Sequence, residues 1–250
     1  MRASMTRLFL TLFCSIAVIA LPLPATASSS TSLARELLEL APTLDRKVLQ
    51  RAVAAMECAL DKGADDAGRL AIIDFSLPSS EQRLWIFDLE SRALLLHDLV
   101  AHGQGSGQNL ASEFSNVSGS HQSSIGLFRT SESYYGRHGY SLRMDGLEPG
   151  VNDLARDRAI VIHGADYVDP AWIDRQGRIG RSLGCPAVRQ EVAGQVVDTL
   201  KDGQFLFSWY PDPEWLPSSR YLNCPSHRQL AVAAGPRTLI PASAREGKHE

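Results

Sequence analysis

Residues 160–164 read Ile-Val-Ile-His-Gly, and residues 180–186 read Gly-Arg-Ser-Leu-Gly-Cys-Pro. The first stretch is typical of a buried β-strand, because β-branched residues favour strands, and it delivers a histidine at its end. The second stretch presents a cysteine after a glycine-rich turn. A strand-end histidine facing a loop cysteine would form a pair for acyl transfer, in which the imidazole of His163 takes the proton of the Cys185 thiol.

Residue type alone leaves an ordinary structural explanation open for both side chains. A lone cysteine is commonly a small buried apolar residue, and a histidine at a strand end is commonly a hydrogen-bonded structural one. The glycines favour chemistry, because glycine lets the backbone turn sharply and direct N–H groups at one point, as an oxyanion hole requires.

The hydrophobic pattern around these segments predicts a mainly β domain. Because the expected strands do not alternate regularly with helices, a doubly wound parallel sheet is disfavoured and the α+β class, mainly β, is predicted. A tight turn is expected at 89–92 and a helix at 190–201. The strands are expected at 71–75, 83–89, 92–100, 125–129, 158–162 and 204–209.

Two helices are expected before the first strand. Ser32 can cap the first, over 33–40, and Thr43 can cap the second. Gly63 is well placed to end the second helix. Its apolar face recurs at spacings of three and four residues and consists of Leu49, Val53, Met56 and Leu60.

The first 27 residues have the pattern of a secretory signal peptide. Arg2 and Arg7 form a positive start, residues 8–21 are apolar, and residues 25–27 provide the small side chains of a cleavage site. The apolar run is short for a membrane span and two prolines close it, so a spanning helix is the weaker alternative. We therefore expect an exported protein, on the periplasmic or cell-wall side, without membrane attachment after cleavage.

The overall composition is that of a globular protein. Of the 250 residues, 44% are hydrophobic and 21% charged, which excludes collagen-like, coiled-coil and wholly disordered classes. The formal net charge is −3 and no basic stripe is present, so nucleic acid is not an expected partner. The expected division is a signal peptide at 1–27, a helical segment at 28–66, the main domain at 67–225 and a loose tail at 226–250.

The chain resembles the L,D-transpeptidase catalytic-domain family (YkuD-like), in its murein L,D-transpeptidase branch. That family's motif is an HG dipeptide followed further along the chain by S-x-G-C, here His163-Gly164 and Ser182-Leu183-Gly184-Cys185. Residues 123–128 resemble the family's S/T-x-x-G-x-F strand. The segments at 134–142, 145–147 and 158–168 are similar to that branch, and the resemblance spans roughly residues 70–210.

The resemblance implies an enzyme that acts on peptidoglycan stem peptides without metal or organic cofactor. Cys185 would attack the bond between meso-diaminopimelate and the terminal D-alanine, and an amine of a second stem would take the acyl group, joining two diaminopimelates. His163 would be the base, with its imidazole oriented by the carbonyl of Gly164. The N–H groups of Gly184 and Cys185 would hold the oxyanion, and Ser182 belongs to the same catalytic motif.

The motif departs from the family at two positions. Leu183 stands where many members have a second histidine, and Ala187 stands where many have arginine. Another cation must therefore bind the substrate carboxylate. The tyrosines of the 134–142 segment fit two roles equally well, lining a substrate groove or packing on the β surface. The candidates for substrate binding are Arg178, Arg181, Arg189 and Tyr140.

The cysteine count and the acceptor leave alternatives open. Three cysteines remain after signal removal, and an odd number in an oxidising compartment means one free thiol or an intermolecular pair. With Cys185 assigned through the resemblance, Cys58 and Cys224 are left as a hypothetical disulfide. Water as acceptor would make the protein an L,D-carboxypeptidase or endopeptidase, and a catalytically inactive wall-binding module is the alternative from another class.

Overall fold

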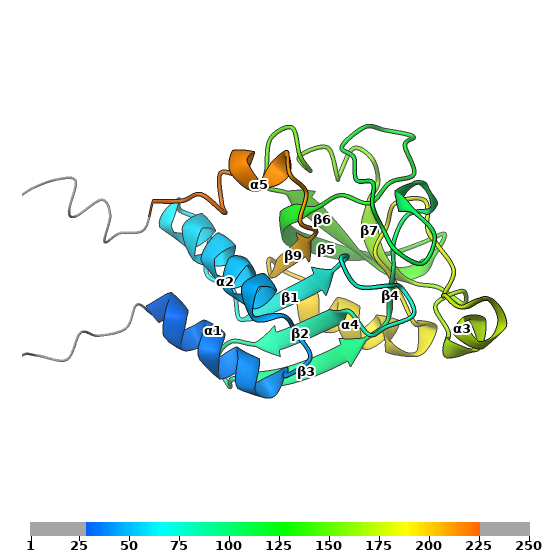
Figure 1. The fold of residues 1–250 in the computed structure, drawn as a ribbon, viewed down its shortest axis with the longest axis horizontal. Coiled ribbons are helices and arrows are strands. Elements are labelled where there is room, and N and C mark those ends of the chain that lie inside the picture. Colours follow the sequence, from blue (N-terminus) through cyan, green and yellow to red (C-terminus); the bar gives the residue numbers. More distant parts are fainter. Residues whose placement is uncertain (1–28, 226–250) are drawn as a thin grey trace, which may run out of the picture.

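The computed structural model describes residues 29–225, and within them nine strands form one mixed sheet (Figure 1). The strand order is β3-β2-β1-β9-β5-β6-β7-β8-β4. Two neighbouring pairs, β1 with β9 and β7 with β8, run parallel, and the others are antiparallel. The strands are β1 (Arg69–Asp74), β2 (Leu84–Asp88), β3 (Ala93–Asp98), β4 (Val100–Ala101), β5 (Gly126–Gly136), β6 (Gly139–Gly146), β7 (Val161–Gly164), β8 (Ala187–Val188) and β9 (Phe205–Trp209).

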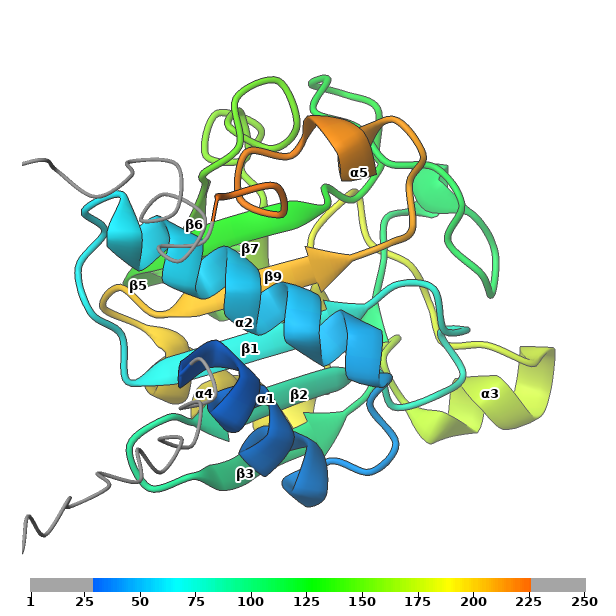
Figure 2. The same cartoon turned by 60° about the vertical axis from the view of Figure 1, so that its left-hand side comes forward.

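Helices cover both sides of this sheet, which confirms the predicted α+β, mainly β class. Helices α1 (Ser29–Leu40) and α2 (Arg46–Asp61) lie across the strands at one end of the sheet, and α4 (Gln190–Leu200) lies behind it (Figure 2). Helix α4 packs against β6 and β7, the strands that lead to the motif histidine. The remaining short helices are η1 (Gln104–Ser106), α3 (Pro170–Gln176) and α5 (Trp215–Ser218).

Helix α2 begins later than predicted. Its N-cap is Asp45, whose carboxylate accepts hydrogen bonds from the amides of Lys47 and Val48 at 2.7 and 3.2 Å, so the expected cap at Thr43 is wrong. A carboxylate at the N-cap satisfies amides that have no partner within the helix. The predicted apolar face is confirmed in the core, where Leu49 and Met56 are almost fully buried. The N-terminal helices thus share one apolar core with the sheet.

The hairpin of β5 and β6 extends well beyond the strand expected at 125–129. The register shifts between Thr130 and Ser133, and this irregularity breaks the alternation by which a strand is recognised in a sequence. The strand expected at 158–162 is also displaced, since β7 begins at Val161 and includes His163 and Gly164. The predicted signal peptide and C-terminal tail lie outside the described residues.

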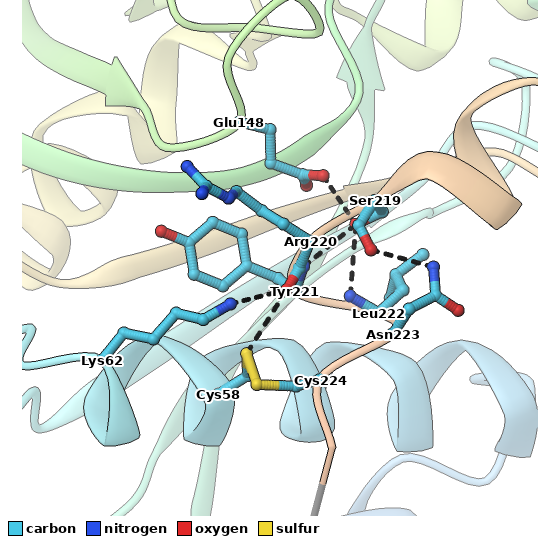
Figure 3. The surroundings of a disulfide bond; sticks show 9 residues. All are labelled: Cys58, Lys62, Glu148, Ser219, Arg220, Tyr221, Leu222, Asn223 and Cys224. Carbon is cyan, nitrogen blue, oxygen red and sulfur yellow. Dashed lines mark hydrogen bonds between the residues drawn. A yellow bond between two sulfur atoms is a disulfide. The ribbon is translucent and has the colours of Figure 1, made fainter.

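A disulfide between Cys58 and Cys224 confirms the hypothetical pairing and closes a separation of 166 residues. Figure 3 shows the bond joining α2 to the segment that follows α5. Nearby, Lys62 Nζ donates to the carbonyl of Arg220 at 2.8 Å. Among residues 29–225, no helix is both long and apolar enough to cross a membrane.

Candidate active site

His163 is held at the end of β7 by its neighbours on both sides. It pairs with Ser141 of β6 and with Ala187 of β8, and its side chain is 2% exposed. Nδ1 lies 2.9 Å from the carbonyl oxygen of Gly164. Because a carbonyl can only accept, Nδ1 carries the hydrogen and Nε2 has the free lone pair. The imidazole is therefore fixed in the tautomer that a general base requires.

A second histidine lies against this base. His138, in the turn between β5 and β6, stacks on His163 with ring centroids 4.3 Å apart and an angle of 25° between the planes. The pKa of His163 is lowered, mainly by burial and further by the charge of His138, while the bond to the carbonyl of Gly164 acts in the opposite direction. A lowered pKa keeps His163 neutral and able to accept a proton at near-neutral pH.

Cys185 presents its thiol to the start of β7. The amide of Val161 donates to Sγ at 3.4 Å, and Sγ faces the carbonyl of Ala159 at 3.7 Å. Burial raises the pKa of the Cys185 thiol, whereas the Val161 amide and the charge of Arg158 lower it. Cys185 forms no disulfide, and the residue as a whole is partly exposed.

Cys185 and His163 both lie along β7, the cysteine through the contact of its thiol with Val161. His163 pairs with Ala187 in the parallel strands β7 and β8. Two residues earlier on each side, the amide of Val161 donates to the thiol of Cys185. No hydrogen bond joins the thiol to the imidazole in the described part of the chain. Such contacts are commonly long in substrate-free enzymes and tighten when substrate is bound.

Ser182 shapes the turn that carries the nucleophile. Its Oγ donates to the carbonyl of Cys185 at 2.6 Å and accepts from the amide of Gly184 at 3.1 Å. Its amide donates to the carbonyl of His102, and its carbonyl accepts from the amide of Gln104. The side chain is buried, so Ser182 acts through the geometry of the turn.

The two amides predicted for the oxyanion hole differ in this structure. The Gly184 amide is directed at Ser182 Oγ, whereas the amide of Cys185 makes no hydrogen bond within residues 29–225. Gly184 has φ +122°, a conformation that side chains rarely adopt. Of the two predicted donors, only the Cys185 amide is thus without a hydrogen-bond partner among the described residues, and its role as an oxyanion donor stays a prediction.

The three candidate arginines have different surroundings. Arg189 binds both carboxylate oxygens of the buried Asp98, with its closest contact at 2.7 Å. Arg181 donates to the carbonyls of Gly107 and Gln104, and Arg178 donates to the carbonyl of Ile179. Neither Arg178 nor Arg181 forms a salt bridge with a carboxylate in the described residues. Because Arg189 is already paired with Asp98, the geometry does not support it as a carboxylate-binding residue, and the role of Arg178 or Arg181 stays a prediction.

Tyr140 lies on the face of the sheet opposite to His163. Adjacent strand residues point to opposite faces, and the neighbour of Tyr140, Ser141, is the one that pairs with His163. The hydroxyl of Tyr140 donates to Asp198 of α4 at 2.9 Å. Its position supports a packing role and not the substrate-binding role expected from sequence.

Two residues near the site were not assigned a role from sequence. His138 becomes recognisable only when the hairpin register places the turn over β7. Arg158 could be noticed only as a cation just before the motif strand, and the structure places its charge close enough to affect Cys185. No group of three or more His, Cys, Asp or Glu side chains in the described ranges is arranged to hold a metal ion.

A mainly β sheet that carries a buried histidine at the end of β7 and a free cysteine in the turn before β8 defines a candidate cysteine–histidine site. The family model for the L,D-transpeptidase catalytic domain matches residues 40–209, more than half of the chain. The protein therefore belongs to the L,D-transpeptidase catalytic-domain family. No curated protein sequence matches the chain.

Solved structures of L,D-transpeptidases resemble the chain only distantly. The similarity to an L,D-transpeptidase from Mycobacterium smegmatis has 13% identity and a TM-score of 0.37, and covers 58% of this chain and 59% of that one. The L,D-transpeptidase (Yku) from Stackebrandtia nassauensis is 13% identical with a TM-score of 0.35, and the match covers 74% of this chain and 78% of that one. The chain thus spans less than two thirds of the Mycobacterium smegmatis protein.

Proposed function

We propose that the protein is an exported peptidoglycan L,D-transpeptidase with Cys185 as nucleophile and His163 as base. The observation that carries this proposal is that both side chains lie along β7: the Val161 amide donates to the Cys185 thiol, and the Gly164 carbonyl fixes the imidazole of His163 two residues further on. Membership of the L,D-transpeptidase catalytic-domain family supports peptidoglycan as the substrate.

In the first half-reaction, Cys185 would form a thioester with the donor stem peptide. His163 Nε2 takes the thiol proton, and Sγ attacks the carbonyl between meso-diaminopimelate and the terminal D-alanine. The resulting oxyanion is stabilised by the Cys185 amide. When the tetrahedral intermediate collapses, the C–N bond breaks, His163 returns the proton to the leaving amine, and D-alanine departs.

In the second half-reaction, an amine of another stem would attack the thioester. His163 accepts a proton from that amine as the new C–N bond forms, the C–S bond breaks, and His163 returns the proton to the sulfur to regenerate the Cys185 thiol. The product is a direct cross-link between two diaminopimelates. Arg178 and Arg181 are the cations with which we expect the substrate carboxylate to interact.

Export is supported by the disulfide between Cys58 and Cys224. Disulfides persist in oxidising compartments and are rare in the reducing cytosol. Together with the signal-peptide pattern of residues 1–27, the disulfide supports our proposal that the protein acts on the periplasmic or cell-wall side.

The products formed from purified disaccharide-tetrapeptides test the proposed function. We expect cross-linked dimers with released D-alanine from the parent protein, and neither product from Cys185→Ala or His163→Gln. The matched histidine control is His97→Gln, because His97 stacks on Trp85 in β2, away from the site. Tripeptides without dimers would contradict transpeptidation and indicate the carboxypeptidase, and no product at all would contradict the enzyme assignment.

A further inference from the structure

Arg158 fastens a loop behind the nucleophile. It precedes β7 and is partly buried. Nη1 donates to Ser124 Oγ at 2.6 Å and to the carbonyl of Ser115, while Nη2 donates to the carbonyl of Gln122 at 2.7 Å and to Ser120 Oγ at 3.2 Å. The guanidinium therefore holds the segment at 115–124 at four points.

All four of these acceptors are uncharged, and Arg158 has no carboxylate partner in the part of the chain that the structure describes. Its Nε–H group is buried and lacks a hydrogen-bond partner there. A partly buried guanidinium is costly unless an anion lies nearby or its donors are all satisfied. The arrangement thus leaves a positive charge without its expected counter-ion.

The group whose negative charge acts on Arg158 is the Cys185 thiol. Arg158 Nη2 is 3.7 Å from the position that a Cβ on Gly184 would occupy, so the guanidinium borders the turn that carries the nucleophile. Burial lowers the pKa of Arg158, and the interaction with the Cys185 thiolate raises it. The same interaction lowers the pKa of Cys185, against the larger effect of burial.

The other titratable groups around the thiol are poor counter-ions. Burial, and then the charge of Cys185, raises the pKa of Tyr167 to about 12, so this phenol is neutral. Burial and the charge of His138 lower the pKa of His163, and a neutral imidazole carries no positive charge. Arg181 lies in the same turn, but the arginine whose charge lowers the pKa of Cys185 is Arg158, and a guanidinium stays charged across the working pH range.

We propose that Arg158 is a positioning residue of the active site, whose guanidinium is the counter-cation of the Cys185 thiolate while its hydrogen bonds hold the 115–124 segment against the nucleophile turn. This proposal rests on the proposed role of Cys185 as nucleophile. In this proposal His163 transfers the proton and Arg158 stabilises the thiolate. In a thiolate–imidazolium pair of Cys185 and His163, the histidine alone would do both.

The pH dependence of Cys185 alkylation by iodoacetamide tests this assignment in the full protein. The thiolate displaces iodide and forms a C–S bond, and mass analysis of the peptide that contains Cys185 follows the reaction. For Arg158→Gln we expect the apparent thiol pKa to rise and alkylation at neutral pH to slow about tenfold, as a shift of one pKa unit implies. Arg158→Lys keeps the charge and should restore most of the rate.

The double variant Ser120→Ala with Ser124→Ala is the matched control, because it removes two of the loop hydrogen bonds and keeps the charge. We expect its alkylation profile to follow that of the parent protein. The proposal is overturned if Arg158→Gln leaves the profile unchanged, or if the double variant shifts it as far as Arg158→Gln does. Should Arg158→Gln fail to fold, the Arg158→Lys and serine variants still decide, since a large shift with the charge retained contradicts the proposal.

Alkylation requires no peptidoglycan, so this experiment is independent of the substrate. A protein that shows the expected thiol profile but no cross-linking would overturn the proposed function and retain the role of Arg158. Cross-linking together with a thiol pKa that does not change in Arg158→Gln would support the proposed function and overturn the role of Arg158.

Discussion

The imidazole of His138 stacks on the imidazole of His163, with 4.3 Å between ring centroids. The contact joins the tip of the β5–β6 hairpin to the end of β7, the neighbouring strand of β6. Nδ1 of His163 is already fixed by the carbonyl of Gly164, so the ring of the base is restrained both in its plane and on its face. The hairpin therefore contributes to the site through position and charge.

Replacement of His138 by phenylalanine should shift the pH dependence of activity. Phenylalanine retains a ring for stacking and cannot be protonated, so the pKa of His163 should rise when the charge of His138 is removed. Since the base works when neutral, we expect the acidic limb of kcat/KM to move to higher pH with little change in the plateau. His97→Phe serves as control, and an unchanged limb or a shift to lower pH in His138→Phe would contradict the account.

Gly164→Ala should destabilise the protein and impair catalysis. A Cβ at Gly164 would lie 2.6 Å from Gln190 Oε1 and 2.8 Å from Ala193 Cβ of α4. We expect a loss of about 1–3 kcal/mol in the free energy of unfolding from this overpacking, and a lower kcat because the acceptor of His163 moves.

The matched control for that substitution is Gly194→Ala in α4, the helix that a Cβ at Gly164 would contact. A Cβ at Gly194 meets nothing within 4 Å, and alanine has the higher helix propensity, by about 1 kcal/mol. Urea denaturation should therefore show equal or greater stability for Gly194→Ala. Equal losses in the two variants would mean that contact with α4 does not explain the glycine at 164.

Arg181 and Arg189 should respond differently to replacement by glutamine. Arg189→Gln leaves the buried carboxylate of Asp98 without its cation, so we expect a loss on the order of 2 kcal/mol in unfolding free energy and an unchanged KM. Arg181→Gln should raise KM for the stem peptide about tenfold, as the loss of one charged hydrogen bond implies. Urea denaturation measures the unfolding free energy and steady-state kinetics measure KM for both variants. A raised KM in Arg189→Gln alone would show that Arg189, and not Arg181, binds the substrate.

Reduction of the disulfide should lower the thermal stability. For a closed loop of this length, the chain-entropy model gives a stabilisation of roughly 5 kcal/mol. We expect dithiothreitol to lower the Tm of the parent protein and to leave the Tm of Cys224→Ser unchanged. A parent Tm that does not respond to complete reduction would show that the bond between Cys58 and Cys224 contributes little.

Local sequence patterns predicted much of the fold. The apolar face of α2 and the strands at 71–75, 83–89 and 204–209 follow from spacing alone. The β5–β6 hairpin was missed beyond residue 129, because the register shift after Thr130 and the polar residues that follow it disrupt the alternation. The cap at Asp45 was missed for a different reason, since Thr43 is also an accepted capping residue, although a weaker one than aspartate.

For the candidate site, the sequence predicted the residues of the motif better than those around it. The role of the Gly164 carbonyl follows from the resemblance, and the bond to His163 Nδ1 agrees with it. The partners of Arg189 and Tyr140 could not be predicted, because Asp98 and Asp198 are distant in sequence and reach them only through the packing of the sheet and α4. His138 and Arg158 depend in the same way on tertiary contacts.

The mass of the intact protein after incubation with a tetrapeptide stem donor tests the central claim most directly. We predict an adduct on Cys185 that corresponds to the donor minus its terminal D-alanine, present in the parent protein and absent from Cys185→Ala. A second stem should discharge this adduct with formation of the cross-linked dimer. Turnover of the donor by Cys185→Ala, or an adduct located on another residue, would contradict the account.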